Sequence, residues 1–219
     1  MRCYYCGDDN DDVNEHIPPK SMYKGFNQFQ NTDAMKNGII DVPSCKRHNT
    51  ETSLTDDLFV YLICSMALGS NLAMNVMITQ VNNLAVMFKE DFESFKLRYS
   101  MMGCTILKKN GDKAFDPGLI TLDDKYTILR TNALKCYRGV AWHQHRTNLP
   151  CDSALNVEWD SYMWDSHKCD LMNYSLDPSD HKSVCISGSS KVFWSTWISD
   201  DSLLMTFYDE VRCRVWKVT

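Results

Sequence analysis

Two short motifs, separated by about forty residues, constrain this chain more than any other feature. Cys3-x-x-Cys6 is followed by Gly7, and Cys45-x-x-His48 repeats the same two-residue spacing. Ligands at this spacing can reach one tetrahedral Zn²⁺, and a glycine after the first pair permits the sharp turn that the backbone must make there. The segment between the motifs is polar, so it cannot stabilise itself by burying apolar surface. The sequence therefore predicts a structural zinc held by Cys3, Cys6, Cys45 and His48.

The cysteine content alone does not decide between metal ligands and disulfides. Ten cysteines in 219 residues would also suit a secreted, disulfide-bonded protein. However, no apolar leader follows Met1, and the apolar-rich region between residues 58 and 86 is interrupted by Ser, Asn, Gln and Gly. We therefore expect neither a signal peptide nor a membrane span, and we expect a cytoplasmic protein whose cysteines are metal ligands and buried thiols.

A carboxylate and an imidazole stand side by side between the two motifs, in the run Asn14-Glu15-His16-Ile17-Pro18. Neighbouring residues of a strand point to opposite faces, although twist at a strand end can bring both towards one pocket. Such a pair has the chemistry for general base catalysis beside a metal ion.

The order Cys-x-x-Cys, Glu-His-Ile-x-Pro, Cys-x-x-His-Asn resembles the HNH endonucleases, whose ββα-metal hairpin and helix are held by a structural zinc between two knuckles. The resemblance covers residues 1 to about 57. It implies that Glu15 and Asn49 bind a catalytic divalent cation, Mg²⁺ or another, and that His16 acts as the general base. A bacterial or phage defence context is suggested by the resemblance alone.

Two positions of the family pattern stay open. The middle asparagine of the family, which orients the base, is missing here, so Asp41 is the candidate for that role and Asn37 is the reserve. His48 could bind the catalytic cation and leave zinc with three protein ligands. The knuckle spacing and the four-ligand norm of structural zinc sites favour His48 as a zinc ligand.

The charge of the chain is unfavourable for nucleic-acid binding. Its net charge is −5, whereas affinity for phosphate comes mainly from Lys and Arg. Local contacts are therefore needed, and we expect DNA in preference to RNA, with a homodimer or a partner subunit supplying additional positive charge. The candidate phosphate contacts flank the motifs and are Lys20, Lys24, Lys46 and Arg47.

The rest of the chain predicts an α+β fold: an N-terminal HNH module, a helical middle, and a C-terminal antiparallel sheet with a packed helix. We place the module at residues 1–57 and a second domain at 58–219. Hydrophobic periodicity predicts the elements of the second part. They are helices between 50 and 95 with a break at Gly69-Ser70, a strand at 102–107 before a turn at 109–112, a helix from Leu122 to Val140 closing near Gly139, and a three-strand meander at 192–198, 203–208 and 211–218.

Other candidates for chemistry are weaker. His143-x-His145, Cys151 and His167-x-Cys169 lack paired knuckle spacing, so we do not expect a second metal site. Five cysteines lie among apolar neighbours and are expected in the core, and the aromatic residues of the C-terminal strands are expected to pack in the sheet rather than to stack on bases. These cysteines are Cys64, Cys104, Cys136, Cys185 and Cys213, and the aromatic residues are Trp194, Trp197, Phe207, Tyr208 and Trp216.

Two functions follow from this sequence. The first is a metal-dependent endonuclease that hydrolyses phosphodiester bonds. The second is a non-catalytic zinc-binding module whose C-terminal domain binds a protein partner. Asp56 and Asp57, in the helix after the second motif, receive no role in either and are expected on a solvated helix face.

Overall fold

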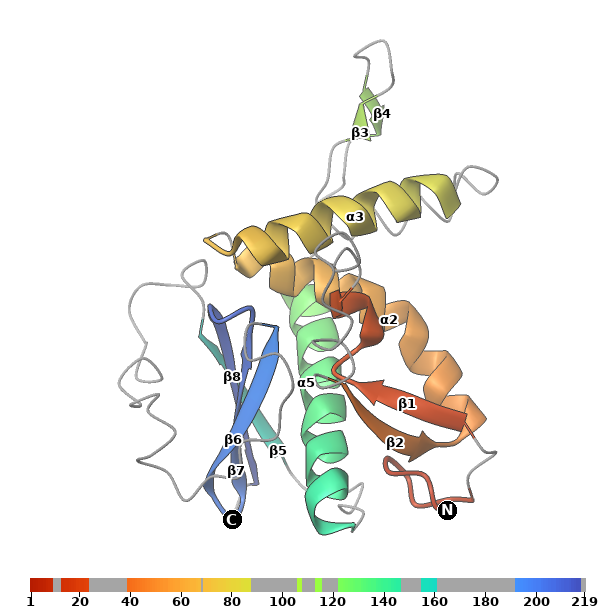
Figure 1. The fold of residues 1–219 in the computed structure, drawn as a ribbon, viewed down its shortest axis with the longest axis vertical. Helices are drawn as coiled ribbons and strands as arrows, with labels where there is room; N and C mark the ends of the chain where they lie inside the picture. Colours follow the sequence, from red (N-terminus) through yellow and green to blue (C-terminus); the bar gives the residue numbers. More distant parts are fainter. Residues whose placement is uncertain are drawn as a thin grey trace.

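A computed structural model of the chain shows a central helix between an N-terminal hairpin and a C-terminal sheet (Figure 1). It describes residues 1–9, 13–23, 39–67, 69–87, 106–107, 113–115, 122–146, 155–160 and 192–217. The fold is mixed α+β with antiparallel sheets, as the sequence predicts.

The N-terminal part is a two-stranded hairpin followed by a long helix. Strand β1 (Val13–Ile17) pairs antiparallel with β2 (Ile40–Ser44), and the short helix η1 (Lys20–Tyr23) follows β1. Helix α2 (Lys46–Met66) begins directly after Cys45. Ile17 and Val42 are buried on one side of the hairpin, which fixes the side that faces the protein interior.

Helix α3 (Asn71–Met87) follows α2 after the predicted break. The break is stabilised on both sides: the Ser70 hydroxyl accepts a hydrogen bond from the Ala73 N–H at 3.3 Å, and the Gly69 N–H donates to the Glu210 carboxylate at 3.0 Å. Strands β3 (Ile106–Leu107) and β4 (Lys113–Phe115) then form a small antiparallel pair. The predicted turn at 109–112 and the predicted helical residues 88–95 lie outside the described residues.

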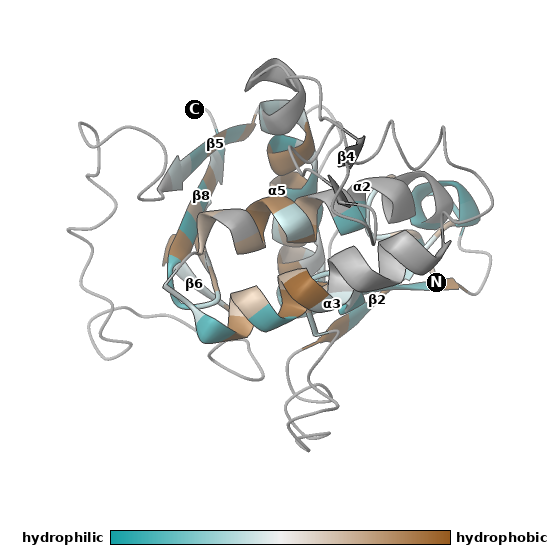
Figure 2. Cartoon of the chain, turned by 90° about the horizontal axis from the view of Figure 1, so that it is seen from above, coloured by the Kyte–Doolittle hydropathy of each residue, from teal (hydrophilic) through white to brown (hydrophobic). Residues whose placement is uncertain are grey.

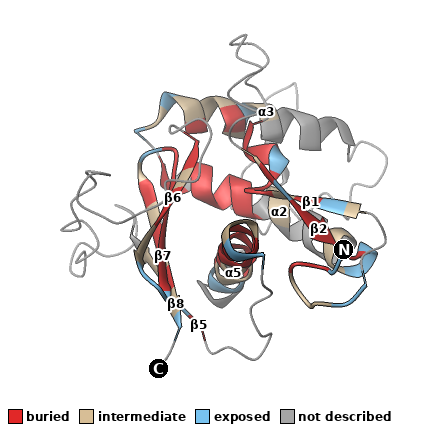
Figure 3. Cartoon of the chain, turned by 60° about the horizontal axis from the view of Figure 1, so that its bottom comes forward, coloured by how far each residue is buried: buried red, intermediate tan, exposed pale blue. Residues whose placement is uncertain are grey.

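Helix α5 (Leu122–His145) is buried along most of its length, and Figure 3 shows it between the hairpin and the sheet. The predicted helix is confirmed, but its predicted end near Gly139 is wrong, because the helix continues to His145. Gly139 serves close packing. A Cβ atom there would lie 2.4 Å from Ile17 Cγ1 of β1, so only glycine lets α5 approach the hairpin this closely.

The C-terminal sheet has the strand order β5-β8-β7-β6, with every neighbouring pair antiparallel. The predicted meander is confirmed, and along β8 buried apolar residues alternate with more polar ones (Figure 2). The fourth strand, β5, was not predicted, although Leu155, Val157 and Trp159 alternate with polar residues there. The strands are β5 (Leu155–Asp160), β6 (Phe193–Ser199), β7 (Ser202–Phe207) and β8 (Val211–Lys217).

One hydrophobic core joins the two parts of the chain. It contains Ile17 of β1, Leu129 of α5 and Phe207 of β7, and Phe59 of α2 lies edge-on to Phe207 with ring centroids 5.6 Å apart. The boundary predicted between residues 57 and 58 falls within α2, so the same core lies on both sides of it. Among the described residues, none of the helices combines the length and apolarity needed to cross a membrane.

Candidate functional site

The backbone around the two motifs brings their side chains to one place. Gly7 has a positive φ of 79°, and its N–H donates to the Cys3 carbonyl at 2.9 Å, which closes the predicted sharp turn. The Tyr4 N–H donates to the Pro43 carbonyl at 2.8 Å and so fixes this turn beside β2. Cys45, at the end of β2, is the N-cap residue of α2, which places His48 in the first turn of the helix.

Cys3, Cys6, Cys45 and His48 form a compact cluster in which all four ligand atoms lie within 4.8 Å of one another. The His48 Nδ1 atom is 3.1 Å from Cys45 Sγ and 3.7 Å from Cys3 Sγ, and Cys6 Sγ is 4.0 Å from Cys45 Sγ. Ligands of a tetrahedral zinc, at about 2.1–2.3 Å from the metal, lie roughly 3.5–3.8 Å apart. The donor set and its size therefore fit a metal ion such as Zn²⁺, as the sequence predicts.

The two thiols of the first motif titrate differently. Burial raises the pKa of Cys3, but backbone hydrogen bonds from Cys6, Cys45 and Tyr5 outweigh it, and the net pKa is lowered. Burial, together with the neighbouring Cys3, raises the pKa of Cys6 to about 12. A dication at the centre of the cluster would favour the thiolate form of both residues, and metal binding therefore releases protons here.

Helix α5 contacts the cluster through an aromatic ring. The Tyr5 ring makes two contacts. Its centroid lies 4.6 Å from that of the His48 ring, and the Arg138 guanidinium carbon lies 4.3 Å from the Tyr5 centroid. Arg138 is buried. A cation close to an aromatic ring attracts it electrostatically, so Arg138 stabilises the ring that packs on His48 of the cluster. The sequence carries no local signal for this contact, because Arg138 is far from both motifs.

His16 and Asp41 face each other across the hairpin. They are direct partners in the β1–β2 register, and His16 Nε2 lies 3.5 Å from Asp41 Oδ1. Both side chains are accessible, with relative exposures of 38% and 64%. The structure therefore brings together the predicted base and the predicted orienting residue on the solvent side of the hairpin.

Glu15 lies on the opposite side of β1, in the protein interior. Its carboxylate is 3.3 Å from the Lys135 ammonium, which is itself 2.7 Å from Asp56 Oδ1 and 2.8 Å from Asp56 Oδ2. Lys135 is fully buried and Glu15 is 5% exposed. The expectation of a solvated helix face is wrong for Asp56, because the buried lysine of α5 draws this carboxylate inwards.

The titration of Asp56 reflects this environment. Burial raises its pKa to about 6, although the Lys135 ammonium favours the ionised form, and the nearby Glu15 carboxylate raises the pKa further. Two carboxylates share one ammonium, so protonation of Asp56 would leave a balanced Glu15–Lys135 pair.

The residues around Glu15 do not fit a catalytic divalent cation. The carboxylate that would bind it is buried, points away from the solvent side of the hairpin, and is already paired with an ammonium at 3.3 Å. Among the described residues, the Cys3-Cys6-Cys45-His48 cluster is the only group of three or more His, Cys, Asp or Glu side chains whose ligand atoms converge. The Glu15 carboxylate therefore does not fit the role of a catalytic metal ligand.

The other predicted site residues that the structure describes belong to segments beside the hairpin. Asn49 is in the first turn of α2, where its N–H donates to the Cys45 carbonyl at 3.0 Å. Lys20, at the start of η1, and Lys46 and Arg47, at the start of α2, are exposed. Lys24 and the reserve candidate Asn37 lie outside the described residues.

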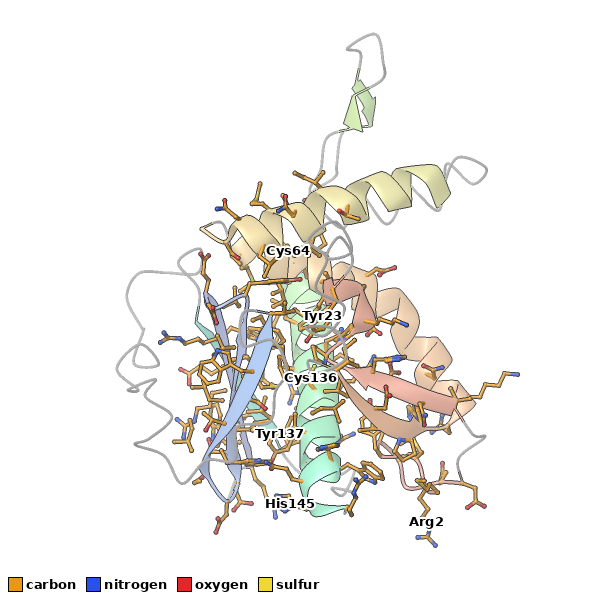
Figure 4. The ribbon with its side chains drawn as sticks, viewed as in Figure 1. Arg2, Tyr23, Cys64, Cys136, Tyr137 and His145 are labelled. Carbon is orange, nitrogen blue, oxygen red and sulfur yellow. The ribbon has the colours of Figure 1, made fainter. Side chains whose placement is uncertain are left out.

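The residues expected to be structural behave accordingly where they are described. His143 and His145 are both on α5, and residues two apart on a helix do not face each other. Burial raises the pKa of Cys64 and of Cys136 to about 12, as expected for core thiols. Trp197 packs in the interface between α5 and the sheet, where its ring lies 5.6 Å from Tyr137 and 5.8 Å from His145. Figure 4 shows these last two residues along α5. Cys104, Cys151, His167, Cys169 and Cys185 lie outside the described residues.

Comparison with protein-family models, with curated proteins and with solved structures returned no match for this chain.

Proposed function

We propose that this chain is an HNH-type endonuclease that hydrolyses phosphodiester bonds of nucleic acid, with DNA as the preferred substrate. The observation that carries the proposal is the His16–Asp41 pair, which lies on the accessible side of a hairpin next to a four-ligand Cys/His cluster. An imidazole held by a carboxylate is a group that can take a proton from water near neutral pH.

The contact between the two side chains supports a separate role for each of them. With the proton of His16 on Nε2 and directed at the Asp41 carboxylate, the proton acceptor is the other ring nitrogen, Nδ1. His16 removes a proton from the attacking water, and Asp41 holds the ring and stabilises the imidazolium that forms. Asp41 thereby takes the orienting role that an asparagine has in the family, with a negative charge instead of a neutral amide.

A phosphodiester also needs positive charge around it, because its own anionic oxygens repel the nucleophile. Lys20, Lys46 and Arg47 are exposed and belong to the segments that flank the hairpin, and we assign the phosphate contacts to them and to Lys24. These few cations stand in a chain of net charge −5. A second copy of the chain or a partner subunit would add positive electrostatic potential near the phosphate.

The test is cleavage of supercoiled plasmid, and of a labelled RNA of matched length, by full-length zinc-loaded protein. Reactions contain EDTA, Mg²⁺, Mn²⁺ or Ni²⁺. The variant His16→Ala should lower the cleavage rate by roughly 10²- to 10⁴-fold, the usual contribution of a general base, and leave the melting temperature unchanged. His145→Ala is the matched control, because it removes an exposed histidine from the end of α5.

The outcomes separate the two functions. A His16→Ala variant as active as the parent protein would remove His16 from the mechanism. A zinc-loaded parent protein that cleaves neither substrate under any condition would favour the non-catalytic zinc-binding module, a reading already supported by the burial of Glu15.

A further inference from the structure

We propose that the Lys135 ammonium is the permanent cation partner of Glu15, in the place where the family resemblance expects a divalent metal. Glu15, Lys135 and Asp56 then form an ion triad, and Glu15 is a positioning residue for β1 rather than a metal ligand. This inference goes beyond the proposed nuclease function, because it concerns how the hairpin is held and holds for the zinc-binding alternative as well.

The geometry of the ion triad is that of a closed site. Lys135 Nζ lies 3.3 Å from Glu15 Oε1 and 2.7 Å from Asp56 Oδ1, and the lysine side chain is 1% exposed. Its three members come from three elements, β1, α5 and α2. Buried charges are retained in proteins when they are paired and hydrogen-bonded, and the Lys135 ammonium pairs with both carboxylates here.

The ion triad is connected directly to the proposed base. Glu15 Oε1 also accepts a hydrogen bond from the backbone N–H of His16 at 3.2 Å. Because side chains alternate along a strand, an inward Glu15 directs His16 to the solvent side, where Asp41 lies. Lys135 therefore fixes the orientation of His16 through Glu15, from a helix near the middle of the chain.

A divalent cation at Glu15 would oppose this arrangement. It would have to lose its water ligands, enter the protein interior and approach an ammonium that lies 3.3 Å from the same carboxylate. Desolvation and like-charge repulsion both disfavour that step. The two carboxylates need a cation for charge balance, and the side chain of Lys135 provides it.

The first test measures melting temperatures of full-length, zinc-loaded variants. Lys135→Met leaves two buried carboxylates without their cation and should lower the melting temperature by roughly 10 °C. Glu15→Gln leaves a balanced Lys135–Asp56 pair and should have a smaller effect. The triple variant Glu15→Gln/Asp56→Asn/Lys135→Met removes all three charges at nearly constant volume and should recover more than half of the loss. Lys217→Met, an exposed lysine of β8, is the control.

A triple variant that is no more stable than Lys135→Met, or that fails to fold, would overturn the ion triad, since the loss would then not come from unbalanced charge. This comparison also covers the case in which Lys135→Met alone does not fold.

The second test is titration of zinc-loaded parent protein and Glu15→Gln with Mn²⁺, followed by calorimetry and electron paramagnetic resonance. We expect Mn²⁺ affinities that agree within twofold, or no Mn²⁺ binding by either protein. A loss of tenfold or more in Glu15→Gln would make Glu15 a metal ligand and overturn the inference. Neither test reads cleavage, so failure of the nuclease proposal and failure of this one are distinguishable.

Discussion

Two clusters hold the N-terminal hairpin, and they differ in where their members come from. The Cys3-Cys6-Cys45-His48 cluster draws all four ligands from the first 48 residues, and Cys6 and His48 are only half-buried. The Glu15-Lys135-Asp56 ion triad reaches across the chain to α5, and its Lys135 and Glu15 side chains are buried. The Cys/His cluster is visible in the sequence from the short spacing of its residues, whereas the ion triad forms only when β1, α2 and α5 pack together.

The difference teaches how the hairpin is integrated into the protein. A metal cluster of local residues can form as soon as the hairpin and the first turn of α2 form. The ion triad needs α5 in place, and α5 needs Gly139 against Ile17 and the sheet on its other side. The cluster therefore shapes the hairpin, and the ion triad attaches it to the rest of the fold.

Removing one metal ligand should have the largest effect. Cys45→Ser takes a thiolate from the cluster and leaves three donors, so we expect loss of bound zinc and unfolding of the hairpin. Structural zinc contributes roughly 10–16 kcal/mol in zinc-finger peptides, more than most single contacts can replace. Zinc content by elemental analysis and a melting curve measure the effect.

Cys64→Ala is the matched control for this variant, because Cys64 is a buried cysteine of α2 that belongs to the hydrophobic core. It should keep one zinc per chain. Stoichiometric zinc and an unchanged melting curve in Cys45→Ser would contradict the assignment of the cluster.

An intermediate effect is expected where α5 approaches the hairpin. The Cβ atom of Gly139→Ala would lie 2.4 Å from Ile17 Cγ1 and 3.2 Å from Ile17 Cβ, so the buried isoleucine and its backbone must move. Overpacking of this kind costs about 2 kcal/mol, which corresponds to a fall of roughly 4–8 °C in melting temperature. Zinc content should stay unchanged, because the cluster does not depend on this contact.

Gly69→Ala tests whether the effect is specific to the core. Its Cβ atom would also meet an atom at 2.4 Å, but that atom is Oε1 of the Glu210 side chain, which can rotate away. We expect this variant to melt within about 2 °C of the parent protein. Equal losses in both glycine variants would argue against close helix–hairpin packing as the cause.

The smallest effect is a pH dependence from Asp56. Its pKa in the folded protein is about 6, above the ordinary value of 3.8, so the folded state takes up a proton at higher pH than the unfolded state. The contribution of Asp56 to stability therefore rises as the pH falls from about 7 to 5, by about 1 kcal/mol. Relative to Asp56→Asn, the parent protein should gain roughly 2–4 °C in melting temperature over this range.

Melting curves of both proteins at half-unit pH steps measure this difference. Because the other titrating groups are common to the two proteins, the subtraction isolates position 56. A parent protein that instead loses stability relative to Asp56→Asn on acidification would show that the ion pair with Lys135 outweighs burial.

The sequence predicts those features whose signals are local. The four residues of the Cys/His cluster share one spacing, and the helices and the meander have clear periodicity, so the cluster, the helices and the meander are all found among the described residues. The sequence predicts a helix end at Gly139 because a glycine has the same sequence signature whether it ends a helix or lets another chain segment approach. The difference lies in Ile17, more than a hundred residues away.

The partner of Glu15 could not be predicted for the same reason. Val13 and Ile17 share the face of β1 that carries Glu15 and so indicate that this face is buried, but nothing near Glu15 indicates its partner, and Lys135 is an ordinary residue in a helical pattern. The pairing is decided when β1, α2 and α5 pack together. Family resemblance supplied a metal for this carboxylate, whereas the three-dimensional structure supplies a lysine.

The buried position of α5 has a consequence for protein engineering. A gene fragment that ends at residue 57 would keep all four residues of the Cys/His cluster but would cut α2 near its middle and omit Lys135, Arg138 and Gly139. We therefore expect that the hairpin cannot be transferred to another protein without α5. A host protein that received the hairpin would have to provide a buried helix against it. That helix would need a lysine and a glycine four residues apart, as Lys135 and Gly139 are in α5.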